Sequence, residues 1–418
     1  MSGFCKKLSS RFCTCYFELN EESKRNGKKY LPASLLLLSA CSLQDETYFD
    51  YAASYSINKE SLAKFDEVSC LDGNSSGANR HAKILQSFER ESAYIIAQKI
   101  NARINQIVFT NNATMANNIA ILGVANANPG CHLITSKIEH KSVLNVFKHL
   151  ESIGYNVTYL DVDRFGNVDL KQLEHSISEN TKLISIQMLN SEIGTLQNVK
   201  AIGAIAKKHG VLFHTDAAQA FCKYHVDVDD MNIALLTISG YKIGAPKGIA
   251  ALYVGDKSKL LPILFGSGDQ FFPGTKPTPL IAAFGQAVKY SHHDMSVIEE
   301  DFYALVNELK KMNDVYVNSA TPSHIVSVSI GGVLLKDVME RMSDYSFSSG
   351  CSCLGPEGHS NVLEAIDPEG KLPACTIRIS FSDRVHKDEL IGLATKLRKV
   401  VARLRGEKNV GLGCSRSG

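Results

Sequence analysis

The sequence predicts an α/β protein with a large domain built on a mostly parallel sheet and a smaller C-terminal α+β domain. Between about residues 47 and 262, short β-branched runs alternate with helical stretches, which is the pattern of βαβ crossovers. After residue 262 a Gly/Pro/Phe-rich segment, Phe265 to Pro279, interrupts the alternation, and a second set of strands and helices begins. A chain of 418 residues is long enough for two such domains.

The strands expected in the large domain are apolar runs, as strands buried on both faces of a parallel sheet must be. They are 106–110, 131–135, 156–160, 182–186, 211–214, 235–238 and 249–254. Helices are expected between them over 114–125 and 140–153, from Asp169 onwards, and over 198–209.

The smaller domain is expected to follow a helical pattern over about 279–312. Its predicted elements are a strand at 325–330, a helix near 335–342, a strand at 376–381 and a charged helix from His386 to about Arg405. The tail after Lys408 is rich in Gly and Ser and is expected to fray. The predicted organisation is therefore an N-terminal extension (1–46), a large domain (47–262), a small domain (263–407) and a flexible tail (408–418).

Charge and cysteine usage exclude several classes of protein. Lys and Arg number 45 and Asp and Glu 43, so the net charge of +2 gives no basic surface for a nucleic acid or a membrane. The eleven cysteines are odd in number and irregularly spaced, which argues against a disulfide framework and favours a reducing cytoplasm. They form no C-x-x-C pair, and no metal site is expected.

The first 46 residues leave two interpretations open. A basic cluster is followed by an apolar run that ends in Ala40-Cys41, which imitates a bacterial lipoprotein signal. The run is too short to span a bilayer, and it begins unusually far from Met1. We favour an extension or packing helix, with a lipoprotein signal that starts later as the alternative.

The most informative segment runs from His214 to Lys247. Asp216 follows one apolar run and Lys242 follows the next, so both are expected at the carboxyl edge of the sheet, where α/β proteins bind ligands. A lysine and an acid in this arrangement suit pyridoxal phosphate. The lysine bonds to the cofactor, and the acid keeps its pyridine nitrogen protonated. Each residue alone has a plainer explanation, as a helix cap for Asp216 and a surface lysine for Lys242.

Two further strand-to-helix turns carry polar side chains. The turn at 110–118 places Thr114 and free backbone N–H groups at a helix start, which suits a phosphate, although Thr114 could also be a simple N-cap. At 139–142, His140 could lie on a cofactor ring or act as an acid or base, or be structural.

These segments resemble the cysteine desulfurases of the NifS/IscS type, in the class V aminotransferase group of fold type I pyridoxal-phosphate enzymes. The resemblance runs in order from Tyr48 to about Arg405. It rests on Asn-Ala-Thr at 112–114, Glu-His-Lys-Ser at 139–142, Asn-Ser-Glu-Ile-Gly at 190–194, Asp-Ala-Ala-Gln at 216–219, Ser-Gly-Tyr-Lys at 239–242 and Arg-Ile-Ser-Phe at 378–381.

The resemblance implies pyridoxal 5'-phosphate as cofactor and L-cysteine as substrate. Lys242 would be the lysine bonded to the cofactor, Asp216 the partner of its pyridine nitrogen, Gln219 the partner of its ring hydroxyl, and His140 the side chain stacked on the ring. Thr114, Ser239 and Tyr241 would hold the phosphate, with Thr275 reaching the phosphate of the neighbouring subunit of a homodimer. Arg378 would bind the substrate carboxylate, which suits a guanidinium fork, and Asn190 and Ser191 would lie beside substrate and cofactor.

The family's nucleophilic cysteine follows a Ser-Ser-Gly run, which here leads to Cys351-Ser352-Cys353. The resemblance implies that Cys353 takes the sulfur of L-cysteine as a persulfide and that alanine leaves. The sulfur would then go to iron–sulfur cluster assembly, through a scaffold protein or another acceptor, or to thiolation. Cys353 could also be a transient ligand of a cluster, and Cys351 has no counterpart in the family pattern.

The chain departs from the family pattern at four places, one of them the unusual Leu-Gly-Pro-Glu-Gly loop at 354–358 after Cys353. Tyr241 replaces a His, Ser191 replaces the second Asn of an Asn-Asn-Glu stretch, and Asp-Gln-Phe-Phe-Pro at 269–273 replaces an Arg-rich segment. The last change is expected to leave aromatic surface near the subunit boundary. Another class V activity (selenocysteine lyase, aminotransferase or a different β-lyase) and a non-catalytic scaffold with the same fold remain alternatives.

Overall fold

The structure is a computed structural model that describes residues 47–291, 294–349 and 360–414, with side chains up to residue 407. The lipoprotein-like run ending at Cys41, together with Cys351 and Cys353, lies outside the described residues. Thr47 and residues 343–346 form a small unit of their own, in which the Thr47 N–H donates to the Asp344 carbonyl at 3.0 Å. The larger unit comprises residues 48–342 and 347–418, and the site lies within it.

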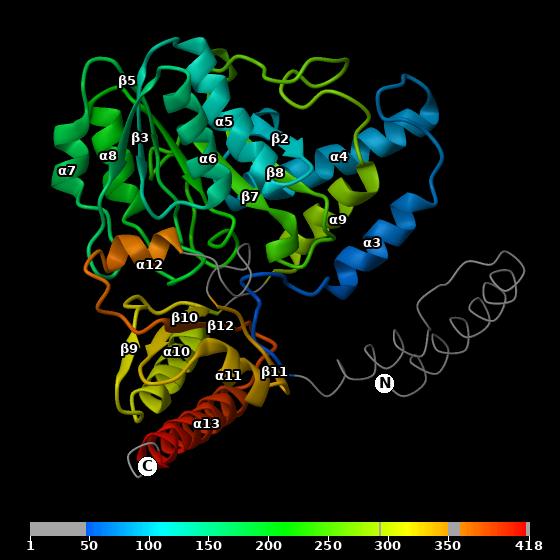
Figure 1. Ribbon diagram of the computed structural model, residues 1–418. Helices are drawn as coiled ribbons and strands as arrows, with labels where there is room; N and C mark the ends of the chain where they lie inside the picture. The colour runs from blue at the N-terminus through cyan, green and yellow to red at the C-terminus, as the bar shows by residue number, and fades with distance from the viewer. Residues whose placement is uncertain (1–46, 292–293, 350–359, 415–418) are drawn as a thin grey trace, which may run out of the picture. The chain divides into compact units, whose positions relative to one another are not determined.

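A seven-stranded sheet forms the centre of the part of this unit that carries the site residues Asp216 and Lys242 at one edge (Figure 1). Its strand order is β2 (Ile107–Thr110), β8 (Ala250–Val254), β7 (Leu235–Ser239), β6 (Leu212–Asp216), β5 (Thr181–Ser185), β3 (His132–Ser136) and β4 (Asn156–Leu160). The strands from β7 to β4 are parallel, whereas β8 is antiparallel to both of its neighbours. The prediction of a mostly parallel sheet is therefore confirmed.

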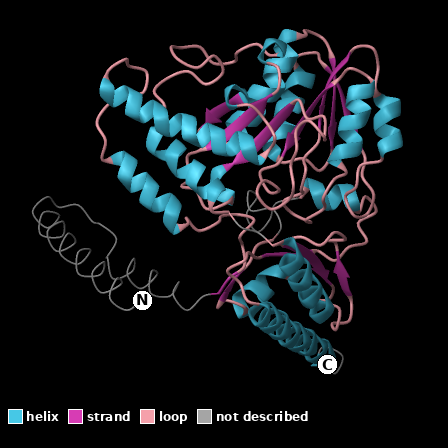
Figure 2. Cartoon of the chain, turned by 180° about the vertical axis from the view of Figure 1, so that it is seen from behind, coloured by secondary structure: helices cyan, strands magenta, loops and turns pink. Residues whose placement is uncertain are grey.

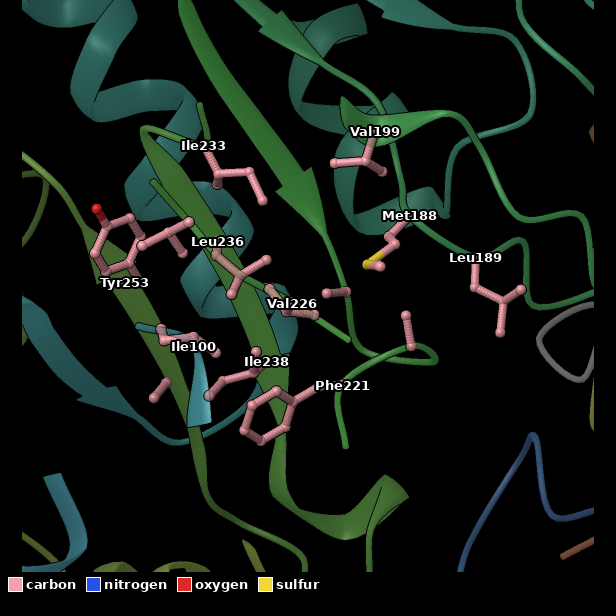
Figure 3. Close-up of a cluster of buried hydrophobic side chains, with 14 of the residues drawn as sticks. Ile100, Met188, Leu189, Val199, Phe221, Val226, Ile233, Leu236, Ile238 and Tyr253 are labelled. Carbon is pink, nitrogen blue, oxygen red and sulfur yellow. The ribbon is translucent and has the colours of Figure 1, made fainter. Parts of the chain in front are cut away.

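Successive residues of these strands are buried on opposite faces of the sheet, because side chains alternate along a strand with a repeat of two residues. Leu133, Leu183 and Leu235 pack under α5 (Ala113–Ala127) and α6 (Lys141–Ser152). Their successors Ile134, Ile184 and Leu236 pack on the other face, under α4 (Arg80–Lys99), α8 (Val199–Lys208) and α9 (Thr278–Lys289). Figure 3 shows part of this second cluster, with Leu236 and Ile238 of β7 beside Phe221 and Val226.

The smaller part of this unit is built on a three-stranded antiparallel sheet with the order β12 (Cys375–Ser380), β10 (Ile325–Ile330) and β9 (Val315–Val317). Three helices lie beside this sheet, as the view from behind shows (Figure 2). They are α10 (Met295–Leu309), α11 (Leu335–Arg341) and α13 (Lys387–Cys414). All six residues of β12 are buried, which fixes Arg378 in the interior. The domain border predicted near residue 262 remains a prediction.

Three features differ from the sequence prediction. The pattern over 279–312 is two helices, α9 and α10, because the Asp294 carboxylate accepts the Ser296 N–H and starts a new helix. Helix α13 continues to Cys414, past its predicted end at Arg405 and into the predicted flexible tail. The helices α3 (Lys59–Ser69), α4, α7 (Leu170–Ser176) and α12 (Asn361–Ile366) complete the described helices, and of these only α7 was expected.

No helix of the described part of the chain combines the length and the apolar composition needed to cross a bilayer.

Candidate active site

A cavity of about 230 Å³ opens at the carboxyl edge of the seven-stranded sheet. Most of the predicted site residues line it: Thr114, His140, Ser191, Asp216, Gln219, Ser239, Tyr241, Lys242 and Arg378. Asp216 ends β6, and Lys242 lies in the short helix Gly240–Lys242 directly after β7, the strand parallel to β6. The structure therefore places these two side chains at the ends of neighbouring strands, as predicted.

Two predicted residues lie outside the lining. Asn190 is buried with its side chain engaged by the backbone, because Oδ1 accepts the N–H groups of Glu192 and Ile193 and Nδ2 donates to the Ile138 carbonyl. Thr275 is exposed on the loop before α9. Asn190 thus shapes the turn that presents Ser191, while Thr275 does not contribute to the lining of the cavity of its own chain.

Asp216 is held at the cavity wall by two donors. Its Oδ1 accepts the Ala218 N–H at 2.9 Å, and its Oδ2 accepts the side-chain amide of Asn117 at 2.8 Å. Asn117 comes from α5, is fully buried, and also donates to Ser142 Oγ at 2.8 Å. A buried carboxylate with both oxygens engaged keeps one orientation, which suits a fixed partner for a cationic ring nitrogen.

His140 begins α6 as its N-cap. Its Nδ1 accepts the Ser142 N–H at 3.1 Å and lies 2.7 Å from Ser142 Oγ. A ring nitrogen that accepts a backbone N–H carries no proton, so the proton of the neutral imidazole is on Nε2. Through Ser142 and Asn117, His140 joins the same hydrogen-bond chain as Asp216.

The start of α5 forms a second wall of the cavity. Asn112 is the N-cap of this helix and accepts the Met115 N–H at 2.8 Å, so Thr114 is not needed as a cap. The first N–H groups of a helix lack partners within it, and the helix dipole favours an anion there. Asn112, Ala113 and Thr114 all line the cavity, so the arrangement suits a phosphate.

Lys242 is buried beside two positively charged side chains. Burial lowers the pKa of its ammonium to about 7, and the charges of Arg378 and Lys223 act in the same direction. Its Nζ donates to the carbonyls of Ala52 and Ala53, and the Tyr241 ring centroid lies 4.8 Å from it. Near neutral pH a large share of Lys242 is therefore the uncharged amine, the form that adds to an aldehyde.

Among the buried polar atoms of the lining, one on Gln219 and one on Ser239 lack a hydrogen-bond partner within the described residues. They are Gln219 Oε1, whose amide group donates to the Ala52 carbonyl at 2.8 Å, and Ser239 Oγ at the end of β7. A buried polar atom left unpaired costs free energy, so its presence indicates a group that the protein binds.

Arg378 reaches the cavity from β12. Its Nη2 donates to Asp50 Oδ1 at 2.6 Å, and its Nη1 donates to the Ser191 carbonyl at 2.9 Å. The second contact uses the backbone, so the change from Asn to Ser at position 191 leaves it intact. The guanidinium is nearly fully buried and faces the cavity, where a carboxylate can bind it.

Four further residues belong to this neighbourhood although the sequence analysis did not select them: Asp50, Asn117, Glu139 and Lys223. Glu139 lines the cavity and accepts the Gln187 N–H and the Ser136 hydroxyl, and burial raises the pKa of its carboxyl to about 8. Lys223 donates to the Lys242 carbonyl at 3.3 Å, and burial lowers the pKa of its ammonium to about 8. Asn117 could have been selected from the sequence, because it is a polar residue inside a segment that was predicted to be buried.

The segment 269–273 corrects one expectation. Phe271 is completely buried with Leu260 and residues of α5 and β8, so of the two aromatic residues only Phe272, which is partly buried, contributes aromatic surface. The Asp269 carboxylate accepts the N–H groups of Phe271 and Phe272 and turns the first ring inward. The exposed aromatic side chain nearby is Phe265, with 88% of its surface exposed.

Comparison with known proteins shows the family of the chain. The family model "Aminotransferase class-V" matches residues 47–392. The chain belongs to this family. Within it the chain is NifS/IscS-like, since it is 35% identical over 379 residues to "Cysteine desulfurase IscS" of Tolumonas auensis, covering 86% of this chain and 93% of that protein. The same name is borne by a protein of Ehrlichia chaffeensis that is 38% identical over 326 residues, 74% of this chain and 80% of that one.

Solved structures share the fold of this chain. The structure titled "SspA in complex with cysteine" is 38% identical, with a TM-score of 0.73 over 80% of this chain and 99% of that one. A "NIFS-LIKE PROTEIN" structure has a TM-score of 0.79 at 24% identity, covering 85% of this chain, and supports the fold alone. The predicted fold class and the resemblance are thus confirmed.

Proposed function

We propose that this class V enzyme is a cysteine desulfurase that uses pyridoxal 5'-phosphate. The arrangement of Lys242 and Asp216 in one cavity is the observation that carries the proposal, because a buried amine and a fixed carboxylate are the two groups that this cofactor needs. Relatives that bear the name cysteine desulfurase, and a related structure with bound cysteine, support the substrate.

The residues of the cavity fit the cofactor. Its phosphate would be held by the start of α5, by Thr114 and by Ser239, whose hydroxyl is otherwise unpaired among the described residues, with Tyr241 beside them. Asp216 would hold the pyridine nitrogen, and Gln219 Oε1, also unpaired, would meet the ring hydroxyl. Lys242 would provide the covalent attachment, and His140 would cover the ring. When bound, pyridoxal phosphate withdraws electrons from an attached amino acid and so weakens the bonds around its α and β carbons.

The chain's own side chains then bind and position the substrate. Arg378 takes the α-carboxylate of L-cysteine, with Ser191 and the turn shaped by Asn190 beside it. Lys242 accepts and returns protons, because a group with a pKa of about 7 exchanges them readily near neutral pH. His140 also lines the cavity, and with its proton on Nε2 it can donate there.

Cys353 is proposed as the sulfur acceptor. Its thiolate attacks the sulfur of the substrate, so that an S–S bond forms while the bond between carbon and sulfur breaks. The electron pair of that bond stays on the carbon, which takes up a proton, and alanine leaves an enzyme persulfide behind. We further propose a homodimer in which Thr275, exposed on its own chain, reaches the phosphate bound by the neighbouring subunit. The partner that takes the sulfur from Cys353 would be an acceptor such as an iron–sulfur scaffold protein in the reducing cytoplasm.

Cofactor loading tests the proposal. Purified protein incubated with pyridoxal phosphate should become yellow and show the absorption band of the lysine-bound cofactor, and Lys242→Ala should lose this band. Lys200→Ala is the matched control, because Lys200 is an exposed lysine paired with Asp230 on the surface. A wild-type protein that stays colourless with excess cofactor would contradict the proposal.

A further inference from the structure

The segment Phe49–Ala53 contributes Ala52 and Ala53 to the cavity lining and carries a carboxylate, that of Asp50, to which the resemblance assigned no role. Asp50 Oδ1 accepts Arg378 Nη2 at 2.6 Å, and the two residues are 328 positions apart in the chain. The side chain of Asp50 is 18% exposed and that of Arg378 only 3% exposed. This is an ion pair largely removed from water, which makes the geometry of its partners more decisive than in a surface pair.

The backbone around Asp50 is fixed against the strand that carries Arg378. The Ser380 N–H donates to the Phe49 carbonyl at 2.7 Å, and the Ala52 N–H donates to Ser380 Oγ at 2.9 Å. The Tyr48 hydroxyl donates to the Asp50 carbonyl at 2.8 Å. The backbone of Asp50 is therefore held against the strand that carries Arg378, which limits how far the carboxylate can follow a moving guanidinium.

A second fixed acceptor defines the plane of the guanidinium. Arg378 Nη1 donates to the Ser191 carbonyl at 2.9 Å, from the turn that Asn190 holds in place. With one acceptor on each terminal nitrogen, the planar group cannot rotate without losing a charge-assisted hydrogen bond. The same group lines the cavity that Lys242 and Asp216 share.

We propose that Asp50 is a positioning residue that holds the Arg378 guanidinium in the orientation in which it binds the substrate's α-carboxylate. The proposal rests on the function proposed above. Asp50 contacts Arg378 and not the reacting atoms, so its removal should weaken carboxylate binding and leave the chemical step nearly unchanged. A purely structural role, as an ion pair between distant segments, would instead lower stability and affect all ligands alike.

The test compares Asp50→Asn with the wild-type holoenzyme. Asn keeps the size and one acceptor oxygen but loses the charge, so the KM for L-cysteine and the Kd for the product L-alanine, measured by calorimetry, should each rise about tenfold. The kcat should stay within about twofold, because the interaction is equal in ground and transition states. For L-cysteine methyl ester, which lacks the anionic carboxylate, the KM should rise much less. The preference of the enzyme for the acid over the ester should therefore narrow.

Two further variants serve as controls. Asp230→Asn makes the same change in an exposed ion pair with Lys200 and should leave KM and Kd unchanged. Asp50→Glu keeps the charge on a longer side chain and should restore part of the binding. An Asp50→Asn enzyme with wild-type KM and Kd overturns the proposal, as does an equal loss for acid and ester accompanied by a lower melting temperature. If the wild-type enzyme forms no alanine, the proposed function fails, while the Kd for L-alanine still tests Asp50.

Discussion

The side-chain amide of Asn117 donates a 2.8 Å hydrogen bond to Oδ2 of Asp216. Asn117 lies on α5 and Asp216 at the end of β6, so the contact ties the helix that offers its N-terminus to the cavity to the strand that offers a carboxylate. The same amide reaches Ser142 Oγ and, through it, His140. The buried amide of Asn117 thus links three parts of the site, which are α5, the end of β6 and His140.

Replacing Asn117 with Ala should weaken cofactor binding. Loss of a hydrogen bond to a charged group costs about 1.5–3 kcal/mol, so the Kd for pyridoxal phosphate should rise at least about tenfold. Titration of the apoprotein, followed by absorbance, measures this. Asn180→Ala removes an exposed amide that donates to the Gly130 carbonyl and should have no effect. An unchanged Kd in Asn117→Ala would show that Asp216 is oriented without it.

The rate at which the apoprotein binds pyridoxal phosphate covalently should depend on pH through Lys242. Only the neutral amine adds to the aldehyde, and burial lowers the pKa of this lysine to about 7. The rate should therefore rise with pH, reach half its maximum near pH 7 and level off above it. Stopped-flow absorbance across this pH range follows the rate, and a rate that still rises steeply above about pH 9, as expected for an ordinary lysine, would contradict the assigned environment.

The stability of the fold should depend on pH through His214, which lies two residues before Asp216 on β6. It is completely buried between Ser185 Oγ, 2.8 Å from Nδ1, and Thr237 Oγ1, 3.1 Å from Nε2, and burial lowers its pKa to about 4. The unfolded chain takes up a proton below its pKa of 6.5, whereas the folded chain does so only near 4. The free energy of unfolding contributed by neutral His214 is thus complete above pH 6.5 and falls by about 3 kcal/mol as the pH drops to 4.

Urea unfolding at several pH values between 4 and 7 measures this dependence. His214→Gln, which does not titrate, should give a shallower decline in unfolding free energy than wild type. His175→Gln alters an exposed histidine that contacts the Lys171 carbonyl and should retain the wild-type slope. Equal slopes for His214→Gln and wild type would mean that His214 is not the group responsible.

The central sheet was predictable from the sequence because its strands are continuous apolar runs. The predicted β4 and β10 segments, 156–160 and 325–330, have their observed bounds. Asp216 and Lys242 could be placed together because each follows such a run, and neighbouring parallel strands end at the same edge. The unpredicted helices α3 and α4 did carry a local signal, since Asn58 and Asn79 accept the N–H groups of Ser61 and Ala82 as N-caps.

Other parts of the site have no local signal at all. The pair Asp50–Arg378 joins two short segments at opposite ends of the chain, and only the packing of β12 against residues 49–52 brings them together. The turn at Asn190 depends on Gly194, whose φ is +70° and where a Cβ would lie 2.5 Å from the Ile325 carbonyl of β10. Contacts of this kind depend on tertiary packing, which hydrophobic periodicity does not encode.

The most direct test of the account is the alanine formed from L-cysteine by the purified holoenzyme in the presence of a reductant. Wild type and Cys351→Ser should release alanine and sulfide over many turnovers. Cys353→Ser should keep the yellow colour of the bound cofactor and form alanine only at the background rate. Alanine formation at the wild-type rate in Cys353→Ser would contradict the assignment of the sulfur acceptor, and its absence from the wild-type enzyme would contradict the desulfurase function itself.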